Sequence, residues 1–198
     1  ALGCCVCAKI LNSTGSSLLA IAVVLLIGLA VGAFNGFVVS KTGIAPFIVT
    51  LSTVSIIRGI TLVMTNASPM PISNAAFKFI GQGTLLGIPF PIYITLILAI
   101  ITAFVMNKTV FGRYVYAIGG NERSAAVAGI QVKKVKISVY MVSGFLAAFT
   151  AIIYTSRLSS GVPSLGNGFE MDAITAAVIG GASLAGGQGH IWGTMIGA

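Results

Sequence analysis

Arg58 is the residue of this chain best placed to do chemistry, because it lies in a long apolar stretch that carries no other charge. Hydroxyl side chains precede and follow it, among them Thr50, Thr53 and Thr61. A charge at the centre of a membrane helix costs roughly 2.5 to 3.5 kcal/mol on insertion scales, so it is expected to face protein or a polar cavity. This group offers hydrogen bonds to a polar solute. The alternative is that Arg58 snorkels to the outer interface.

Three more ionisable residues and the single histidine lie toward the end of the chain. Arg157 precedes the Gly-rich segment 161–168, and Glu170 and Asp172 follow it, which suits an outer loop at the mouth of a path or against a soluble partner. Two solvated carboxylates at a helix start are the alternative. His190 has no second ligand nearby, so we expect a packed or helix-bonded imidazole there.

The sequence contains no pattern typical of catalysis or metal binding. Cys4, Cys5 and Cys7 crowd the N-terminus, but no histidine or acidic residue lies near enough to complete a tetrahedral site. The G-x-x-x-x-G-K-[ST], H-E-x-x-H and G-x-S-x-G patterns are all missing. We therefore expect no catalytic residue, no metal and no cofactor.

Composition defines the class of protein. The chain is 57% hydrophobic and 7% charged, with a mean hydropathy of +1.05, which leaves too little polar surface to cover a soluble domain. The formal net charge of +8 would suggest nucleic acid in a soluble protein. Here, however, six of the eleven basic residues lie in residues 107–136, as retention of Lys and Arg on the cytoplasmic side predicts. The sequence therefore predicts an integral membrane protein that does not bind nucleic acid.

The gaps between charged residues locate the membrane spans, since about 20 mainly apolar residues cross a bilayer as a helix. We predict an all-α, polytopic helical bundle that forms a single transmembrane domain over residues 1–198. About five spans are expected, at residues 18–39, 44–65, 88–106, 137–154 and 173–198. The first is not expected to be a removable signal peptide, because a signal peptide has a shorter apolar region with a basic flank before it.

Small residues recur every fourth position in the first and last predicted spans, where they would let helix backbones approach closely. The positions are Gly28, Gly32 and Gly36 in the first and Gly181, Ala185, Gly189, Gly193 and Gly197 in the last. Helix packing is the simpler interpretation. The alternative for the last span is that its glycines break the helix inside the protein, as happens around transport pathways.

The segment 107–136 is predicted to be a cytoplasmic loop with a short helix that begins near Asn121. Asn121 can cap the first free N–H groups, Glu122 suits the positive end of the helix, and Gly129 can end it in a left-handed turn. With this loop inside, Lys41 also lies inside, whereas Lys9, Lys78 and Arg157 lie outside. A short capped helix between two spans suggests a docking element.

Both ends of the chain suggest a piece of a longer protein. The sequence begins with Ala1, and it stops at Ala198 within an apolar run that has no polar flank. We therefore expect further spans in the complete protein.

Four blocks in matching order resemble the membrane permease subunits of bacterial ATP-binding-cassette sugar importers of the ribose, galactose and xylose type. They are TGIAPFIVTL at 42–51, RG at 58–59, AIGGN at 117–121 with AA and AGI within 125–130, and GFEMDAI at 168–174 leading into GGASLAGGQG at 180–189. The resemblance extends from about residue 42 to the last residue. Permeases of this type are longer, with further spans at both ends, and this chain would be a fragment of one.

The resemblance implies that segment 121–130 is the cytoplasmic coupling helix that fits a cleft in a separate ATP-hydrolysing subunit. The residues that it assigns to coupling are Asn121, Glu122, Arg123, Ala125, Ala126, Gly129 and Ile130. The small alanines would allow close docking, and Arg123, Lys133 and Lys134 could pair with acids on the partner. A positive-inside loop without a partner is the alternative.

The resemblance further implies a multi-pass protein of the bacterial inner membrane that moves a ribose-like monosaccharide by alternating access. Its partners would be a cytoplasmic ATPase subunit, a periplasmic or secreted solute-binding protein, a second permease copy and membrane lipid. Thr50, Thr53, Arg58 and Thr61 are the candidates for the pathway, and Arg157, Glu170 and Asp172 for the outer face.

Several other functions stay open. An autonomous secondary carrier or channel would move solute without ATP hydrolysis, a membrane anchor subunit would move none, and a branched-chain amino acid permease would share the architecture but not the solute. The sequence contains only three acidic residues, none of them deep within the first four spans, which argues against a proton-driven carrier.

Overall fold

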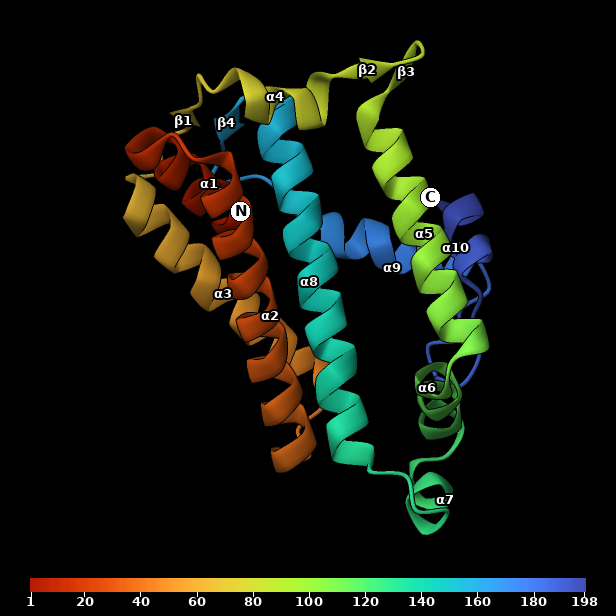
Figure 1. Ribbon diagram of the computed structural model, residues 1–198. Helices are drawn as coiled ribbons and strands as arrows, with labels where there is room; N and C mark the ends of the chain where they lie inside the picture. Colours follow the sequence, from red (N-terminus) through yellow and green to blue (C-terminus); the bar gives the residue numbers. More distant parts are fainter. The chain divides into compact units, whose positions relative to one another are not determined.

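The computed structural model describes residues 1–198 and is almost entirely helical (Figure 1). Its helices are α1 (Leu2–Thr14), α2 (Ser17–Thr42), α3 (Pro46–Thr65), α4 (Ala75–Gln82), α5 (Phe90–Lys108), α6 (Val110–Gly120), α7 (Glu122–Val127), α8 (Val132–Leu158), α9 (Phe169–Ile179) and α10 (Ile191–Gly197). Four two-residue strands, β1 (Met70–Pro71), β2 (Thr84–Leu85), β3 (Ile88–Pro89) and β4 (Ser160–Gly161), form the antiparallel pairs β1–β4 and β2–β3.

Four helices, α2, α3, α5 and α8, are long and apolar enough to cross a membrane. They coincide with the first four predicted spans to within a few residues at most ends. Only 11% to 17% of the most apolar stretch of each is buried. The exposed apolar surface is what a lipid-facing bundle requires. Helix α8 is longer than predicted, because the helix continues through the basic residues of its first turns, where the prediction ended it at the charges. Helix α1 was not predicted.

The segment predicted as the fifth span is not one long helix, which agrees with the alternative that its glycines break the helix. Helix α9 ends at Ile179, and α10 begins only at Ile191. Between them Gly181, Gly186 and Gly187 have φ angles of +87°, +94° and +75°, a left-handed conformation that glycine adopts without steric cost. The predicted stripe of small residues therefore does not lie on one helix.

Helices α9 and α10 instead pack against each other. A methyl group on Gly193 would overlap the carbonyl oxygen of Gly180, and one on Gly197 would overlap the carbonyl oxygen of Ala176. Two short helices thus meet through bare backbone. We call the segment between them, residues 180–190, the break.

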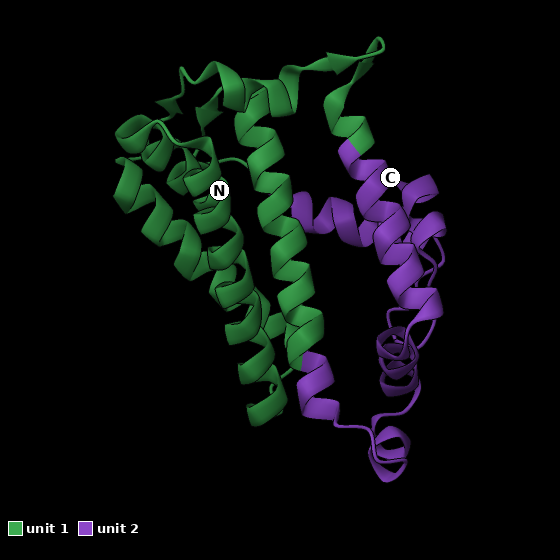
Figure 2. Cartoon of the chain, in the orientation of Figure 1, with its two compact units in different colours: residues 1–93, 137–165 green, residues 94–136, 166–198 purple.

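The chain divides into two compact units (Figure 2). Unit 1 contains residues 1–93 and 137–165, and unit 2 contains residues 94–136 and 166–198. Most of α8 belongs to unit 1, whereas most of α5 and all of α6, α7, α9 and α10 belong to unit 2.

The glycine stripe of α2 packs against α8 in unit 1, which confirms the predicted role of Gly28, Gly32 and Gly36 in helix packing. A methyl group on Gly32 would overlap the carbonyl oxygen of Tyr140, and one on Gly36 would lie 2.8 Å from the Cα atom of Ile137. Gly28 faces Gly144, a glycine on α8 itself. Lipid gives apolar helices little reason to associate, so this close approach supplies the contact.

A buried hydroxyl fastens α4 to the end of α8, also in unit 1. Ser156 is fully buried, donates to the carbonyl oxygen of Phe77 at 2.6 Å and accepts from the Gly81 N–H at 2.7 Å. Beneath it lies the core of the unit, where α1, α2, α4 and α8 meet. The buried core residues are Cys7, Ala8, Leu11, Ala20, Val24, Ile72, Phe77, Ala148 and Ile152.

We predict that Gly32→Ala destabilises the purified protein in detergent, because its methyl group would lie within 2.9 Å of the Met141 Cα atom. Overpacking of this kind costs about 1 to 3 kcal/mol. Gly59→Ala on α3 is the matched control, since nothing lies within 4 Å of that position. A thermal unfolding curve should show a lower midpoint for Gly32→Ala only. Equal midpoints would contradict the α2–α8 contact.

Candidate functional site

Helix α7 is capped at both ends by the residues that the sequence predicts. The Asn121 side-chain oxygen accepts from the Ser124 N–H at 3.0 Å and so satisfies a donor in the first turn. At the other end Gly129 has a φ of +84°, and its N–H donates to the Ala126 carbonyl oxygen at 3.0 Å. The Ile130 N–H donates to the Ala125 carbonyl oxygen at 3.1 Å. The left-handed end predicted at Gly129 is confirmed.

An ion pair ties α7 to the first turns of α8 within unit 2. The Lys136 Nζ atom lies 2.6 Å from the Glu122 Oε2 atom, and the two side chains are 28% and 54% exposed. A pair this open to solvent contributes about 1 kcal/mol or less. The sequence assigned Glu122 to the helix terminus alone and missed Lys136, which lies fourteen residues further on. That pairing depends on the turn between α7 and α8, which spacing does not reveal.

The outward surface of α7 differs from the predicted one. Ala125, one of the small residues that the resemblance assigned to coupling, is only 4% exposed and packs inward. Val127, which the sequence did not single out, is 91% exposed. Arg123, Ala126 and Ala128 are exposed beside it. The surface that α7 offers is therefore a valine flanked by small residues and a cation, and we call it the α7 tip.

Helix α6 joins α5 to α7 and was not predicted as a helix. Its N-cap is Thr109, whose hydroxyl accepts from the Gly112 N–H at 3.4 Å and donates to the Val105 carbonyl oxygen at 2.7 Å. Gly112 packs directly on the backbone of Met106. At its other end the Asn121 N–H donates to the Ala117 carbonyl oxygen at 3.1 Å. Asn121 therefore closes α6 with its backbone and starts α7 with its side chain.

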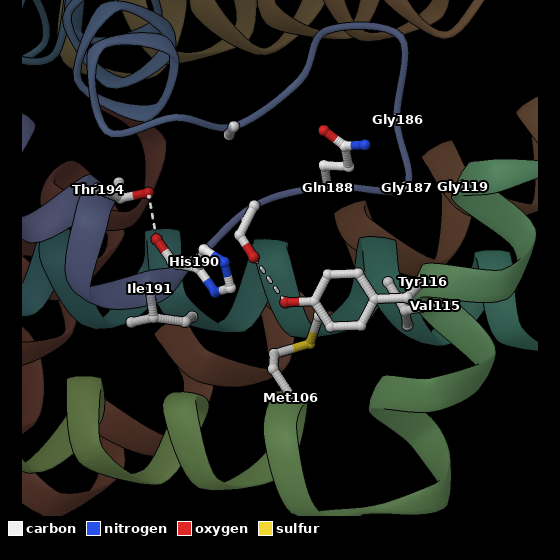
Figure 3. Close-up of a pocket in the computed structure, with 12 residues that line it drawn as sticks. Met106, Val115, Tyr116, Gly119, Gly186, Gly187, Gln188, His190, Ile191 and Thr194 are labelled. Atoms are coloured by element: carbon white, nitrogen blue, oxygen red, sulfur yellow. Dashed lines mark hydrogen bonds between the residues drawn. The ribbon is translucent and has the colours of Figure 1, made fainter.

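One side of α6, which carries Tyr116 and Gly119, touches the break between α9 and α10. The Tyr116 hydroxyl donates to the Gly189 carbonyl oxygen at 2.8 Å, a bond drawn in Figure 3. One helical turn on, a methyl group on Gly119 would lie 2.5 Å from the Gly187 nitrogen. A cavity of roughly 350 Å³ lies beside these contacts, lined by Met106, Val115, Tyr116, Gly119, Ala182, Gly186, Gly187, Gln188, Gly189, His190, Ile191 and Thr194.

His190 occupies the end of the break next to this cavity. It is the residue before α10, and its carbonyl oxygen accepts from the Thr194 N–H at 3.1 Å. Its ring is drawn beside Ile191 and Tyr116 in Figure 3. The residue thus serves α10 through its backbone carbonyl oxygen alone. Its imidazole is exposed and makes no cap hydrogen bond, so the predicted packed or helix-bonded ring is not observed.

The pathway candidates all lie on α3, in unit 1, with different exposure. Thr61 is fully buried and Thr53 nearly so, and each hydroxyl donates to the carbonyl oxygen four residues earlier on its own helix. Thr53 also donates to the Asn35 side-chain oxygen of α2 at 2.6 Å. Thr50 and Arg58 are partly exposed. The Thr50 hydroxyl also donates to its own helix, to the carbonyl oxygens of Pro46 and Phe47 at 3.0 and 3.1 Å. The three hydroxyls are therefore bonded to backbone, and they differ in exposure.

The outer-face candidates fall in different units. Arg157 lies in the last turn of α8, in unit 1, where its carbonyl oxygen accepts from the Gln82 amide at 3.0 Å. Glu170 and Asp172 lie in the first turn of α9, in unit 2, and neither forms a salt bridge. Carboxylates in that turn favour the positive end of the helix, which was the simpler of the two interpretations.

Known proteins resemble the whole chain. The family described as the permease component of branched-chain amino acid transport systems matches residues 1–198. A ribose import permease protein of Haemophilus influenzae is 47% identical over 184 residues, which cover 91% of this chain and 57% of that protein. A ribose import permease protein of Bacillus subtilis is 48% identical over 166 residues, 82% of this chain and 51% of that protein. An L-arabinose permease protein of Azospirillum brasilense is 36% identical over 192 residues, 97% and 57% of the two chains. No solved structure matches the chain significantly.

Four apolar helices in an almost entirely helical fold, together with these bacterial relatives, define a multi-pass protein of the bacterial inner membrane. The chain belongs to the permease family of the branched-chain amino acid transport systems. It spans between about half and three fifths of the length of the curated relatives named above.

We predict that Asn121→Ala loosens α7 without unfolding the protein, because loss of an N-cap costs about 1 kcal/mol, or roughly fivefold in a local equilibrium. Hydrogen exchange measured by mass spectrometry should show the amides of residues 122–127 exchanging about fivefold faster. Asn107→Ala is the control, since Asn107 is exposed and caps no helix. Unchanged protection of α7 in Asn121→Ala would disprove the cap.

Proposed function

We propose that this chain is part of the membrane-spanning permease subunit of an ATP-driven importer and that it carries a ribose-like monosaccharide across the bacterial inner membrane. Relatives named for ribose and L-arabinose cover nearly the whole chain at up to about half identity. The hydrolysis of ATP is assigned to a separate cytoplasmic subunit, because the chain has no nucleotide-binding loop.

The α7 tip is the observation that carries this proposal. A short helix held by two caps and an ion pair presents Val127 at 91% exposure, in the connection between two membrane helices. Burying one such side chain is worth about 1.5 kcal/mol or more, and the surrounding small residues allow a partner to come close. The ATPase subunit would supply an apolar cleft for Val127 and an acidic group for Arg123.

The charge distribution supports placing α7 in the cytoplasm. Residues 107–136 hold six of the eleven basic residues, and Lys41 lies at the α2–α3 connection, on the same side by alternation of the spans. Lys9, Lys78 and Arg157 lie on the opposite side. The ATPase would therefore reach α7 from the cytoplasm, and a periplasmic or secreted solute-binding protein would approach the side of Arg157, Glu170 and Asp172.

The mechanism in this proposal is alternating access. Closure of two ATPase subunits displaces α7, and the path opens to one side of the membrane at a time. A second permease copy completes the path. Arg58 and Thr50 are the pathway candidates with partly exposed side chains. The Arg58 guanidinium can donate to a sugar hydroxyl, and the Thr50 hydroxyl oxygen, whose proton goes to the Pro46 and Phe47 carbonyl oxygens, can accept from one. Thr53 and Thr61 would contribute only if α3 separated from its neighbours.

The family description keeps a second solute class in view, since it refers to branched-chain amino acids. An amino acid would bring a carboxylate and an ammonium group, which favour charged partners. The candidate group on α3 contains one cation and several hydroxyls and has no acidic residue. This composition favours the sugar.

We predict that Val127→Asp in the complete permease weakens binding of the ATPase subunit at least tenfold, because a carboxylate would enter an apolar cleft without a partner. The dissociation constant is measured by titrating the ATPase subunit against the permease in nanodiscs. Gln131→Asp adds the same charge at an exposed position outside α7 and should bind normally. Equal affinity of the two variants would exclude the α7 tip as the docking surface.

Uptake into proteoliposomes that contain the permease, the ATPase and the solute-binding protein separates the candidate functions. We predict that labelled ribose enters only when ATP is present, and that an excess of unlabelled ribose but not of leucine suppresses it. Uptake without ATP would instead indicate an autonomous carrier or channel. Competition by leucine would move the solute to the branched-chain amino acids.

A further inference from the structure

The break between α9 and α10 is an ordered loop. The Ser183 N–H donates to the Gln188 carbonyl oxygen at 3.0 Å, and the Gly186 N–H donates to the Ser183 carbonyl oxygen at 3.0 Å. The Ala185 N–H donates to the Ser183 hydroxyl at 3.2 Å. These internal hydrogen bonds give the loop a defined conformation of its own.

Two contacts one helical turn apart hold this loop against α6, all within unit 2. Tyr116 donates to the Gly189 carbonyl oxygen at 2.8 Å, and the backbone of Gly119 lies against Gly186 and Gly187. A methyl group on Gly186 would lie 2.7 Å from the Gly119 carbonyl oxygen, so the two backbones meet without side chains between them. Two such contacts fix both the position and the orientation of the loop on α6.

Helix α6 is in turn joined to α7 without a flexible linker. The Asn121 N–H closes the last turn of α6, and the Asn121 side chain opens the first turn of α7. No other residue lies between the two helices. We therefore expect a displacement of α7 to displace α6, and through its two contacts the break.

We propose that Tyr116 and Gly119 of α6 transmit movement of α7 to the break between α9 and α10, so that docking of a partner on α7 repositions a broken helix. This role rests on the proposed function of α7. The cavity of roughly 350 Å³ beside the contacts gives the loop room to shift without displacing packed side chains. Tyr116 and Gly119 act here as positioning residues.

The first arm of the test measures the contact between α6 and the break in the absence of the ATPase. Tyr116→Phe in the complete permease removes only the hydroxyl, and loss of one hydrogen bond corresponds to about fivefold faster opening. Hydrogen exchange should rise about fivefold in the amides of residues 183–194. Tyr114→Phe is the control on the same helix, because the Tyr114 hydroxyl makes no hydrogen bond. Unchanged exchange in Tyr116→Phe would overturn the proposal.

A glycine pair gives an independent version of this arm. Gly119→Ala places a methyl group 2.5 Å from the Gly187 nitrogen, whereas nothing lies within 4 Å of a methyl group on Gly120. The exchange of residues 183–194 should therefore rise in Gly119→Ala and stay normal in Gly120→Ala. The same exchange in both variants would overturn the contact.

The second arm measures transmission in the assembled importer. Tyr116→Phe should lower the ratio of sugar uptake to ATP hydrolysis about fivefold, while binding of the ATPase stays normal. Faster hydrogen exchange of residues 183–194 together with an unchanged ratio of uptake to ATP hydrolysis would overturn the role of Tyr116 in transmission. If the proposed function is wrong, the wild-type permease will bind no ATPase. That result would overturn the role in transmission, but the hydrogen-exchange result on the α6 contact would still hold.

Discussion

Contact between bare backbones at glycine is the interaction on which the rest of this structure depends. A membrane removes the hydrophobic drive that brings helices together in water, so packing requires that the chains approach until main-chain atoms touch. Gly32 allows this between α2 and α8, and Gly193 allows it between α9 and α10. Gly119 allows it between α6 and the break. Each contact holds one element of the fold directly against another, and no side chain could be inserted into any of them without moving backbone.

Features set by local chemistry could be predicted from the sequence. The gaps between charges gave the four long helices, the spacing of Gly28, Gly32 and Gly36 gave a packing face, and Asn121 and Gly129 gave the caps of α7. Contacts that form only when the chain folds back on itself could not be predicted. The packing of Gly193 on Gly180 requires that α10 turn back on α9, and a repeat of four residues indicates only a stripe. Small residues at every fourth position are compatible with one straight helix and also with two short helices packed against each other. The additional glycines between α9 and α10 favour the two short helices.

The sequence predicted the position and the caps of helix α7 but not which of its side chains are exposed. Residue types predicted α7 as a docking element, yet the small-residue argument selected Ala125, which packs inward, and passed over Val127, which is exposed. A six-residue helix has too few positions for periodicity to define its faces, so only its neighbours decide which side is open. The Glu122–Lys136 pair and the contacts of Tyr116 were missed for the same reason, because each joins segments whose meeting depends on the turns between them.

The glycine contacts also change how this molecule should be dissected by mutation. Replacement by alanine normally subtracts atoms, and a resulting defect indicates a lost interaction. At Gly32, Gly119 and Gly193 the same replacement adds an atom where backbone already lies, so the defect records crowding. A systematic alanine scan of this protein would therefore mark its most sensitive positions at residues that have no side chain to contribute, and these positions would trace the helix crossings and not the solute path.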